Sequence, residues 1–230
     1  MTFTQICQHL LQISSYVTSD GFLSLIGWHR EGMGNVLITK CSGDKMVCII
    51  VGQVIDEHPY CGSMGNLLEG NTFNKLMEST KFSFMLSRPL DSEFAQDFDQ
   101  AVRTAKNWEG SIAMTDNRRY SVEAVGHENL LRFMAACWEK RDVPLKPSID
   151  TVDTNTSSWP VPVTRQAAFN ATKLTHRILP LTVYDQDRLF IDCSYANTVL
   201  RNAIIKVHFT VKHYAIRHDS GFDSFSGIIQ

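Results

Sequence analysis

The segment AIIKVHFTVKHYAIRH, residues 203–218, most constrains how this chain can fold. Apolar and polar side chains alternate along it, the period of a β-strand with one face in a core. The apolar face carries Ile205, Val207, Phe209 and Val211. The opposite face carries Lys206, His208, Lys212 and Tyr214. Because one face is apolar and the other polar, the sequence predicts a sheet with one buried side and one basic side.

The whole chain is predicted to have an α+β fold, with mainly antiparallel β-sheets joined by short links. We expect three or four helices in the N-terminal part and a β-rich C-terminal part. The predicted helices span 2–17, 91–108 and 127–141, with a weaker one at 66–79 and a short one at 165–172. The predicted strands span 22–29, 35–41, 45–55, 81–87, 111–115, 119–125, 174–184, 188–193 and 199–217.

Composition changes sharply after residue 141. Four of the seven prolines lie between residues 142 and 163, which is typical of a linker or a long surface loop. We therefore predict an α+β domain at 1–141, a Pro/Ser/Thr-rich linker or loop at 142–164, a β-rich basic region at 165–218 and an apolar Ser/Gly tail at 219–230.

Charge is unevenly distributed along the chain. The net charge is −2, yet residues 165–218 hold eight Lys and Arg against three Asp and Glu. Such an excess favours an anionic partner: RNA, DNA or an anionic membrane surface. The candidate anion-binding residues are Lys206, His208, Lys212, Tyr214, Arg177, Arg188 and Arg201.

The tail has large apolar residues in a glycine- and serine-spaced frame. These residues are costly to leave in water, so we expect the tail to dock on its own domain or on a neighbouring copy. The candidate oligomer contacts are Phe222, Phe225, Ile228 and Ile229.

No strong catalytic, metal or cofactor motif is present. The glycine pairs at 32–34 and 62–65 lack phosphate-loop patterns, so no cofactor is predicted. His208 and His213 are five apart on a strand and point to opposite faces, so no metal site is predicted. A thiol enzyme is the remaining alternative, with Cys61 as nucleophile beside His58, His29 or His127.

Six scattered cysteines without a CxxC pair indicate a reduced compartment, and no signal peptide or transmembrane segment is recognised. The predicted location is therefore cytoplasmic or in a virion, and not secreted. The closing strand also resembles the last strand of many virus coat proteins over about 16 residues.

The leading functional prediction is a non-enzymatic, self-assembling structural protein of the viral capsid or matrix kind. Its basic C-terminal sheet would contact nucleic acid or lipid head groups, and its partner would be a second copy of itself. The alternatives are a Cys61-dependent hydrolase or transferase, and a small intracellular adaptor or nucleic-acid-binding protein.

Overall fold

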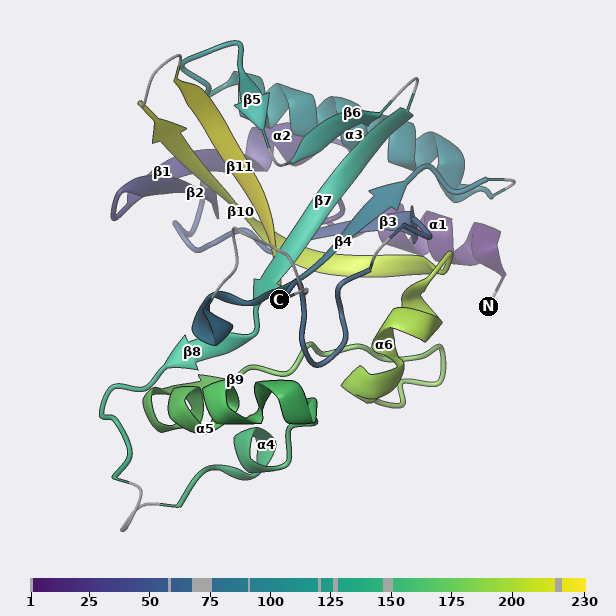
Figure 1. Ribbon diagram of the computed structural model, residues 1–230. Helices are drawn as coiled ribbons and strands as arrows, with labels where there is room; N and C mark the ends of the chain where they lie inside the picture. Colours follow the sequence, from purple (N-terminus) through teal and green to yellow (C-terminus); the bar gives the residue numbers. More distant parts are fainter. Residues whose placement is uncertain are drawn as a thin grey trace. The chain divides into compact units, whose positions relative to one another are not determined.

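The computed structural model describes residues 2–57, 59–67, 76–90, 92–119, 121–125, 128–146, 151–217 and 221–230 (Figure 1). Two compact units divide the chain. The first, here called the barrel unit, comprises Met1–Ile55, Met85–Met134 and Asn202–Gln230. The second, here called the inserted unit, comprises Asp56–Phe84 and Ala135–Arg201.

Five strands close into a ring around the core of the barrel unit (Figure 1). They are β3 (Cys48–Val54), β4 (Lys81–Ser87), β7 (Glu128–Ala136), β10 (Ile204–Ile216) and β11 (Phe222–Ile229). Residues 81–84 of β4 and 135–136 of β7 are counted with the inserted unit. Their order is β10–β3–β4–β7–β11, and the pairing of β11 with β10 closes the ring. The pair β7–β11 is parallel, whereas β10 is antiparallel to both β3 and β11. In chain order the ring reads first, second, third, fifth, fourth, which is the Greek-key barrel called the OB-fold.

Further strands extend the sheet outward from this ring. The hairpin of β1 (Ile26–Glu31) and β2 (Gly34–Thr39) joins β10, where Lys212 pairs with Val36. On the other side, β5 (Arg118–Arg119) runs parallel to β11, and β6 (Val122–Val125) is antiparallel to β7. The hairpin and β5 thereby widen the outer surface around β10 and β11.

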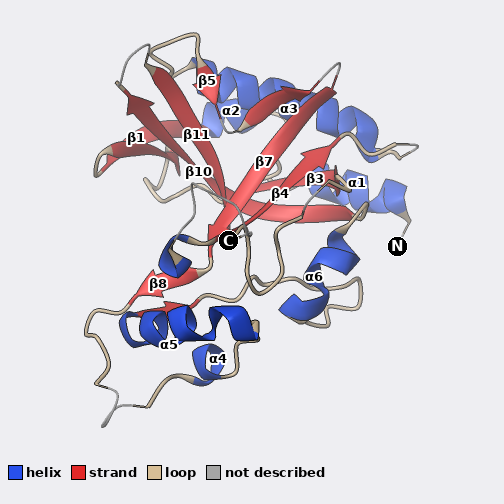
Figure 2. Cartoon of the chain, viewed as in Figure 1, coloured by secondary structure: helices blue, strands red, loops and turns tan. Residues whose placement is uncertain are grey.

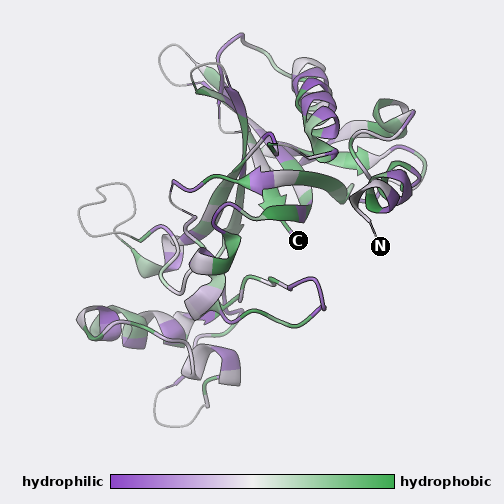
Figure 3. Ribbon diagram, turned by 90° about the vertical axis from the view of Figure 1, so that its right-hand side faces the viewer, coloured by the Kyte–Doolittle hydropathy of each residue, from purple (hydrophilic) through white to green (hydrophobic). Residues whose placement is uncertain are grey.

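Helix α3 (Phe94–Gly110) is amphipathic and supplies one wall of the core (Figure 3). Its apolar residues recur every three or four positions, so they share one helical face. Those buried are Phe94, Phe98, Ala101, Val102, Ala105 and Trp108. Inside the ring, Phe133 of β7 meets Phe209 of β10 edge to face, with ring centroids 4.9 Å apart.

The helix α1 (Phe3–Leu11) begins with a capping box formed by Thr2 and Gln5. It covers the outer side of β3, where Leu10 and Tyr16 pack with Ile49 and Val51. Helix α2 (Phe22–Leu25) is a single turn that leads into β1.

The described part of the inserted unit consists of short helices, long loops and a two-stranded sheet (Figure 2). Thr156 is fully buried there, and its hydroxyl accepts a hydrogen bond from the Ile178 backbone at 2.9 Å. Trp138 packs on Phe169, with ring centroids 5.9 Å apart. The elements are α4 (Thr154–Ser157), α5 (Gln166–Thr175), α6 (Cys193–Leu200), β8 (Trp138–Lys140), β9 (His176–Ile178), and the 3-10 turns η1 (Met77–Ser79) and η2 (Val163–Arg165).

The predicted α+β class is confirmed, but the predicted N-terminal helices are only partly found. The segment 127–141 is β7 and β8 instead of a helix, with His127 outside the described residues. Leu131 and Phe133 both face the core, as in strand alternation. Pairing with β6 and with β11 outweighs the local helical pattern. The weaker helix at 66–79 is found only as the η1 turn, and residues 68–75 lie outside the described part.

The C-terminal part is less β-rich than predicted. The short helix at 165–172 is present as α5. The strand predicted at 174–184 is reduced to β9, and the one at 188–193 to a bridge between Tyr184 and Phe190. Residues 199 and 200 end α6, so the predicted last strand begins at Ile204. No helix in the described residues is long and apolar enough to cross a membrane.

Candidate nucleic-acid interface

The seven predicted anion-binding residues belong to two different units. Lys206, His208, Lys212 and Tyr214 all lie on β10 of the barrel unit. Arg177, Arg188 and Arg201 belong to the inserted unit.

The three arginines of the inserted unit are in different settings. Arg177 forms an ion pair with Glu139, and Arg201 forms one with Asp56 at 3.1 Å. Both pairs are exposed, and a carboxylate already offsets each charge. Arg188 lies in a turn with a left-handed backbone, at φ 62°. We therefore restrict the candidate interface to the barrel unit.

Strand β10 separates its two faces as the alternation predicts. Val207, Phe209, Val211 and His213 are buried, while Lys206 and His208 are exposed. Lys212 and Tyr214 are partly exposed farther along the same outer face. Thr210 is the exception on this face, since it is buried opposite Ile228 of β11.

The neighbouring strand β11 adds small polar and aromatic groups to this outer face. In the register, Lys212 lies opposite Ser226, Tyr214 opposite Ser224 and Ile216 opposite Phe222. Directly paired residues point to the same side of a sheet. A mixed row of cationic, aromatic and hydroxyl groups therefore follows the two strands.

Arg119 of β5 completes this row beside β11. Its guanidinium lies 4.4 Å from the centroid of the Phe222 ring, which is cation–π geometry. The sequence predicts a strand at 119–125 but did not place Arg119 among the anion-binding residues, since it lies about a hundred residues before β11. Only the parallel pairing of β5 with β11 brings Arg119 to this face.

The Tyr214 ring lies against Gly34 of β2, where a larger residue would leave no room for it. A Cβ atom at Gly34 would lie 2.6 Å from Cε1 of Tyr214 and 2.7 Å from the His213 carbonyl oxygen. The absence of a side chain at Gly34 therefore allows the Tyr214 ring to pack directly on the β2 backbone. We name the outer surface formed by Lys206, His208, Lys212, Tyr214, Arg119 and Phe222 the β10–β11 face.

Basic groups from β1, from the segment after β2 and from β10 surround Glu31 at the end of β1. Lys45 forms an ion pair with Glu31 at 2.8 Å. The hydrogen bond from Lys45, and the charges of Lys45, Lys212 and His29, lower the pKa of Glu31. The Glu31 carboxylate thus lies among several basic groups at the end of β1.

The positive charge of the β10–β11 face comes from lysine and arginine at neutral pH. Burial and the nearby charge of Lys206 lower the pKa of His208 below its ordinary value of 6.5. His208 is therefore mostly neutral near pH 7 and offers a hydrogen-bonding ring there.

A buried network supports the β10–β11 face from inside. His213 Nε2 lies 2.7 Å from Asp223 Oδ1, and Asn35 Nδ2 lies 3.2 Å from His213 Nδ1. Asp223 Oδ2 accepts hydrogen bonds from the backbone of Met114 and Thr115, at 3.0 and 2.7 Å. Burial raises the pKa of Asp223, but the hydrogen bonds from His213, Thr115 and Met114 lower it below its ordinary value. The network ties β2, β10 and β11 to the segment that leads into β5.

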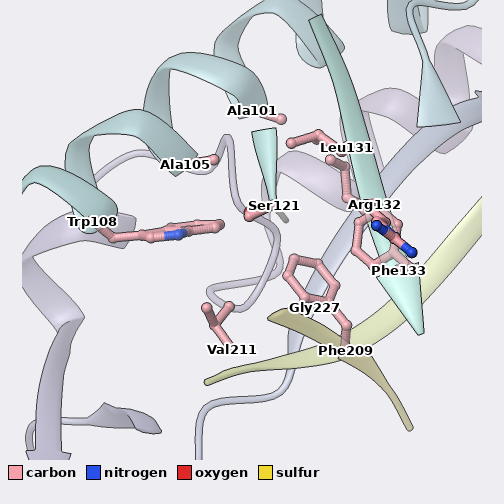
Figure 4. Close-up of a pocket in the computed structure, with 11 residues that line it drawn as sticks. Ala101, Ala105, Trp108, Ser121, Leu131, Arg132, Phe133, Phe209, Val211 and Gly227 are labelled. Atoms are coloured by element: carbon pink, nitrogen blue, oxygen red, sulfur yellow. The ribbon is translucent and has the colours of Figure 1, made fainter. Parts of the chain in front are cut away.

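The interior of the barrel unit is filled by side chains (Figure 4). Trp108 of α3, Phe133 of β7 and Phe209 of β10 converge there, leaving a cavity of about 10 Å³. That volume is close to the space of one water molecule. The space among these side chains is therefore too small for a ligand larger than about one water molecule.

Cys61 is not placed as an activated nucleophile. It is fully buried, and burial raises the pKa of its thiol to about 12. Its backbone N–H donates to Asn197 Oδ1 at 2.6 Å, and its sulfur lies 3.8 Å from the Ser83 carbonyl oxygen. His58 and His127 lie outside the described residues, and His29 belongs to the other unit. A thiol with a raised pKa is a poor nucleophile at neutral pH.

Metal ligands do not converge in the described part of the chain, where no group of three His, Cys, Asp or Glu side chains could hold an ion.

The tail from Phe222 onward forms β11, and Phe225 is fully buried in the barrel core. The tail therefore packs on its own fold. Self-association through Phe222, Ile228 and Ile229 stays a prediction.

Comparison with known proteins gives one structural likeness. The chain is similar to gp2.5, a single-stranded DNA binding protein encoded by bacteriophage T7. The two share 10% sequence identity over 80% of this chain and 88% of that one, with a TM-score of 0.33. Such a score does not define a shared fold. No protein-family model and no curated protein matches the chain.

Proposed function

We propose that this protein binds single-stranded nucleic acid along the β10–β11 face, without catalysing a reaction. The observation that carries the proposal is the row of Lys206, Lys212 and Arg119 beside the exposed parts of Tyr214 and Phe222. The row lies on the outside of a barrel with OB-fold strand order, and such barrels often bind oligonucleotides. Other barrels with this strand order carry other functions, so the residues of the row carry the proposal and the strand order supports it.

A single strand suits the face better than a duplex. Cations attract the phosphate backbone, and unpaired bases stack on aromatic rings. Tyr214 of β10 and Phe222 of β11 point to the same outer side of the sheet. Ser224 and Ser226 of β11 share this side, opposite Tyr214 and Lys212. A duplex would keep its bases stacked inside and leave these rings without a partner.

The absence of catalysis is part of the proposal. The raised pKa of Cys61 supports it, because the one nucleophile that the sequence offered is held as a thiol. The filled barrel interior also supports a surface that binds an extended ligand.

Charge removal tests the electrostatic part. In the Lys206→Ala/Lys212→Ala variant, affinity for a labelled oligo-dT should fall roughly tenfold at moderate salt. The slope of log K against log salt should fall by about 1.4, because about 0.7 counterion is released per neutralised phosphate on a single strand. Lys140→Ala, an exposed lysine of the inserted unit, is the matched control and should bind like the wild type.

Stacking is tested at Tyr214. Tyr214→Ala should weaken oligonucleotide binding by about 1–3 kcal/mol, whereas Tyr214→Phe should retain it. An unchanged affinity in both the double lysine variant and Tyr214→Ala would overturn the proposal. Binding to anionic lipid vesicles but not to oligonucleotides would overturn it as well, and would assign the face to a membrane surface.

A further inference from the structure

A rigid hairpin of the inserted unit exposes large apolar side chains. Tyr184, Leu189 and Phe190 are 59%, 65% and 54% exposed. The Tyr184 and Phe190 rings contact each other edge to face, with centroids 6.0 Å apart. We name residues 183–191 the aromatic hairpin.

Backbone hydrogen bonds hold the aromatic hairpin in one conformation. Ile191 N donates to Val183 O at 2.8 Å, and Asp185 N donates to Leu189 O at 3.0 Å. The Asp185 carboxylate closes the turn by accepting from the backbone of Asp187 and Leu189, at 2.8 and 2.9 Å. Because the conformation is already fixed, docking of this hairpin would cost little ordering entropy.

The tip of the aromatic hairpin is acidic. Asp185 and Asp187 flank Gln186, and Arg188 is the one cation among residues 183–191. This charge disfavours nucleic acid and anionic lipid as its partner. An apolar site with a cationic rim is the complementary surface.

The barrel unit of the same chain carries such a site, here called the basic groove. It has a volume of about 380 Å³, within the range of ligand-binding clefts. Its apolar part is formed by Leu90, Phe98 and Val102, and Leu90 is 69% exposed. Its charged lining residues are Arg88, Arg103, Lys106, Asp99 and Glu128.

Two of the cations of the basic groove are available to a partner carboxylate. Arg103 donates to Gln100 Oε1 at 2.7 and 3.0 Å, and Lys106 donates to Asn129 Oδ1 at 2.9 Å. Both acceptors are neutral amides, which orient the cations without neutralising them. Arg88, in contrast, is paired with Asp99 at 3.0 Å.

We propose that the aromatic hairpin of one copy docks in the basic groove of a second copy. Tyr184 and Phe190 cover Leu90, and the acidic tip meets Arg103 and Lys106. The hairpin side chains Tyr184, Leu189 and Phe190 and the groove residue Leu90 are all more than half exposed. The contact joins two different surfaces, so it is heterologous and builds rows or rings. This self-association is independent of the proposed nucleic-acid binding.

A charge-swap experiment tests the contact. The tip-reversed variant Gln186→Lys/Asp187→Lys keeps the turn carboxylate of Asp185. The groove-reversed variant is Arg103→Glu/Lys106→Glu. Sedimentation velocity over a concentration series should show self-association of the wild type, weakened at least roughly tenfold in each variant alone. An equal mixture of the two variants should regain association, because a reversed tip meets a reversed groove.

Controls separate this contact from other effects. Lys140→Glu should associate like the wild type, and Phe190→Ser should weaken association without a change of charge. A wild type that stays monomeric at its highest soluble concentration would overturn the proposal. A mixture of the reversed variants that associates no better than each alone would overturn it too. Binding of an oligonucleotide short enough for one copy should not change in any of these variants, so the two proposals can fail separately.

Discussion

His213 Nε2 lies 2.7 Å from Asp223 Oδ1, and both side chains are fully shielded from solvent. The pair joins β10 to β11 beneath the β10–β11 face. The second oxygen of Asp223 holds the backbone of Met114 and Thr115, just before β5. The placement of Arg119 on the surface therefore depends on a buried carboxylate.

Removal of that carboxylate should strongly destabilise the protein. Asp223→Ala leaves buried His213 and the N–H groups of Met114 and Thr115 without their acceptor. Loss of one member of a buried pair costs about 3–5 kcal/mol. Urea unfolding should show this loss in the free energy of unfolding. Asp116→Ala, an exposed aspartate nearby in the chain, is the control and should change it by less than about 0.5 kcal/mol.

Acid should weaken the same network. The folded pKa of Asp223 is below its ordinary value of 3.8, so its contribution is complete above that value and is lost as pH falls through the lowered folded pKa. Urea unfolding of wild type and Asp223→Asn from pH 6 downward measures this dependence. The variant should lack part of the acid-induced loss seen in the wild type. Parallel pH profiles for the two proteins would contradict the assignment.

Glu109 should have the opposite pH dependence. It is 4% exposed at the end of α3, and its Oε1 has no hydrogen-bond partner among the described residues. Burial raises its pKa from 4.5 to about 7, although Ser121, Arg118 and Lys106 partly lower it. The folded protein then holds the proton between these two pH values, and stability falls as pH rises across them.

The Glu109→Gln variant should remove this penalty. At pH 8 it should be more stable than the wild type by up to about 3 kcal/mol, and at pH 4 the difference should disappear. Thermal or urea unfolding at the two pH values measures both. Equal stability of variant and wild type at pH 8 would mean that Glu109 ionises without cost.

Gly34→Ala should disturb both stability and the position of Tyr214. The new Cβ would lie within 3 Å of the Tyr214 ring and of the His213 carbonyl oxygen, and the backbone cannot yield cheaply. We expect a loss of about 1–3 kcal/mol, as for other overpacked sites. Gly27→Ala on the same hairpin is the control, since its new methyl group meets only the flexible Lys40 side chain at 3.3 Å. A Gly34→Ala variant as stable as the control would show that the ring is free to move.

The local sequence pattern correctly predicted those helices and strands that bury one side only. The alternation of β10 and the apolar face of α3 both depend on burial of a single side, which the sequence states directly. β7 was misread because its apolar residues also fit a helical face. Its strand conformation is stabilised by pairing with β6, which precedes it directly, and with β11, about ninety residues later in the chain.

The sequence predicted the residues of the candidate site that lie on β10 but not Arg119 of β5. Lys206, Lys212 and Tyr214 share one strand, so their common face follows from period two alone. Arg119 reaches them through a parallel pairing that has no local signal. In the other direction, the basic excess of residues 165–218 is divided between two units, because α5, α6 and their loops belong to the inserted unit.

The position of β11 in the ring governs how the barrel can be assembled during synthesis. This strand pairs with both β10 and β7, so the barrel stays open until residues 222–229 have left the ribosome. The segments of the inserted unit emerge earlier and can form their local helices before β11 is available to pair with β7 and β10. Nascent chains stalled before Phe222 would thus expose the inner sides of β7 and β10, a natural substrate for chaperones.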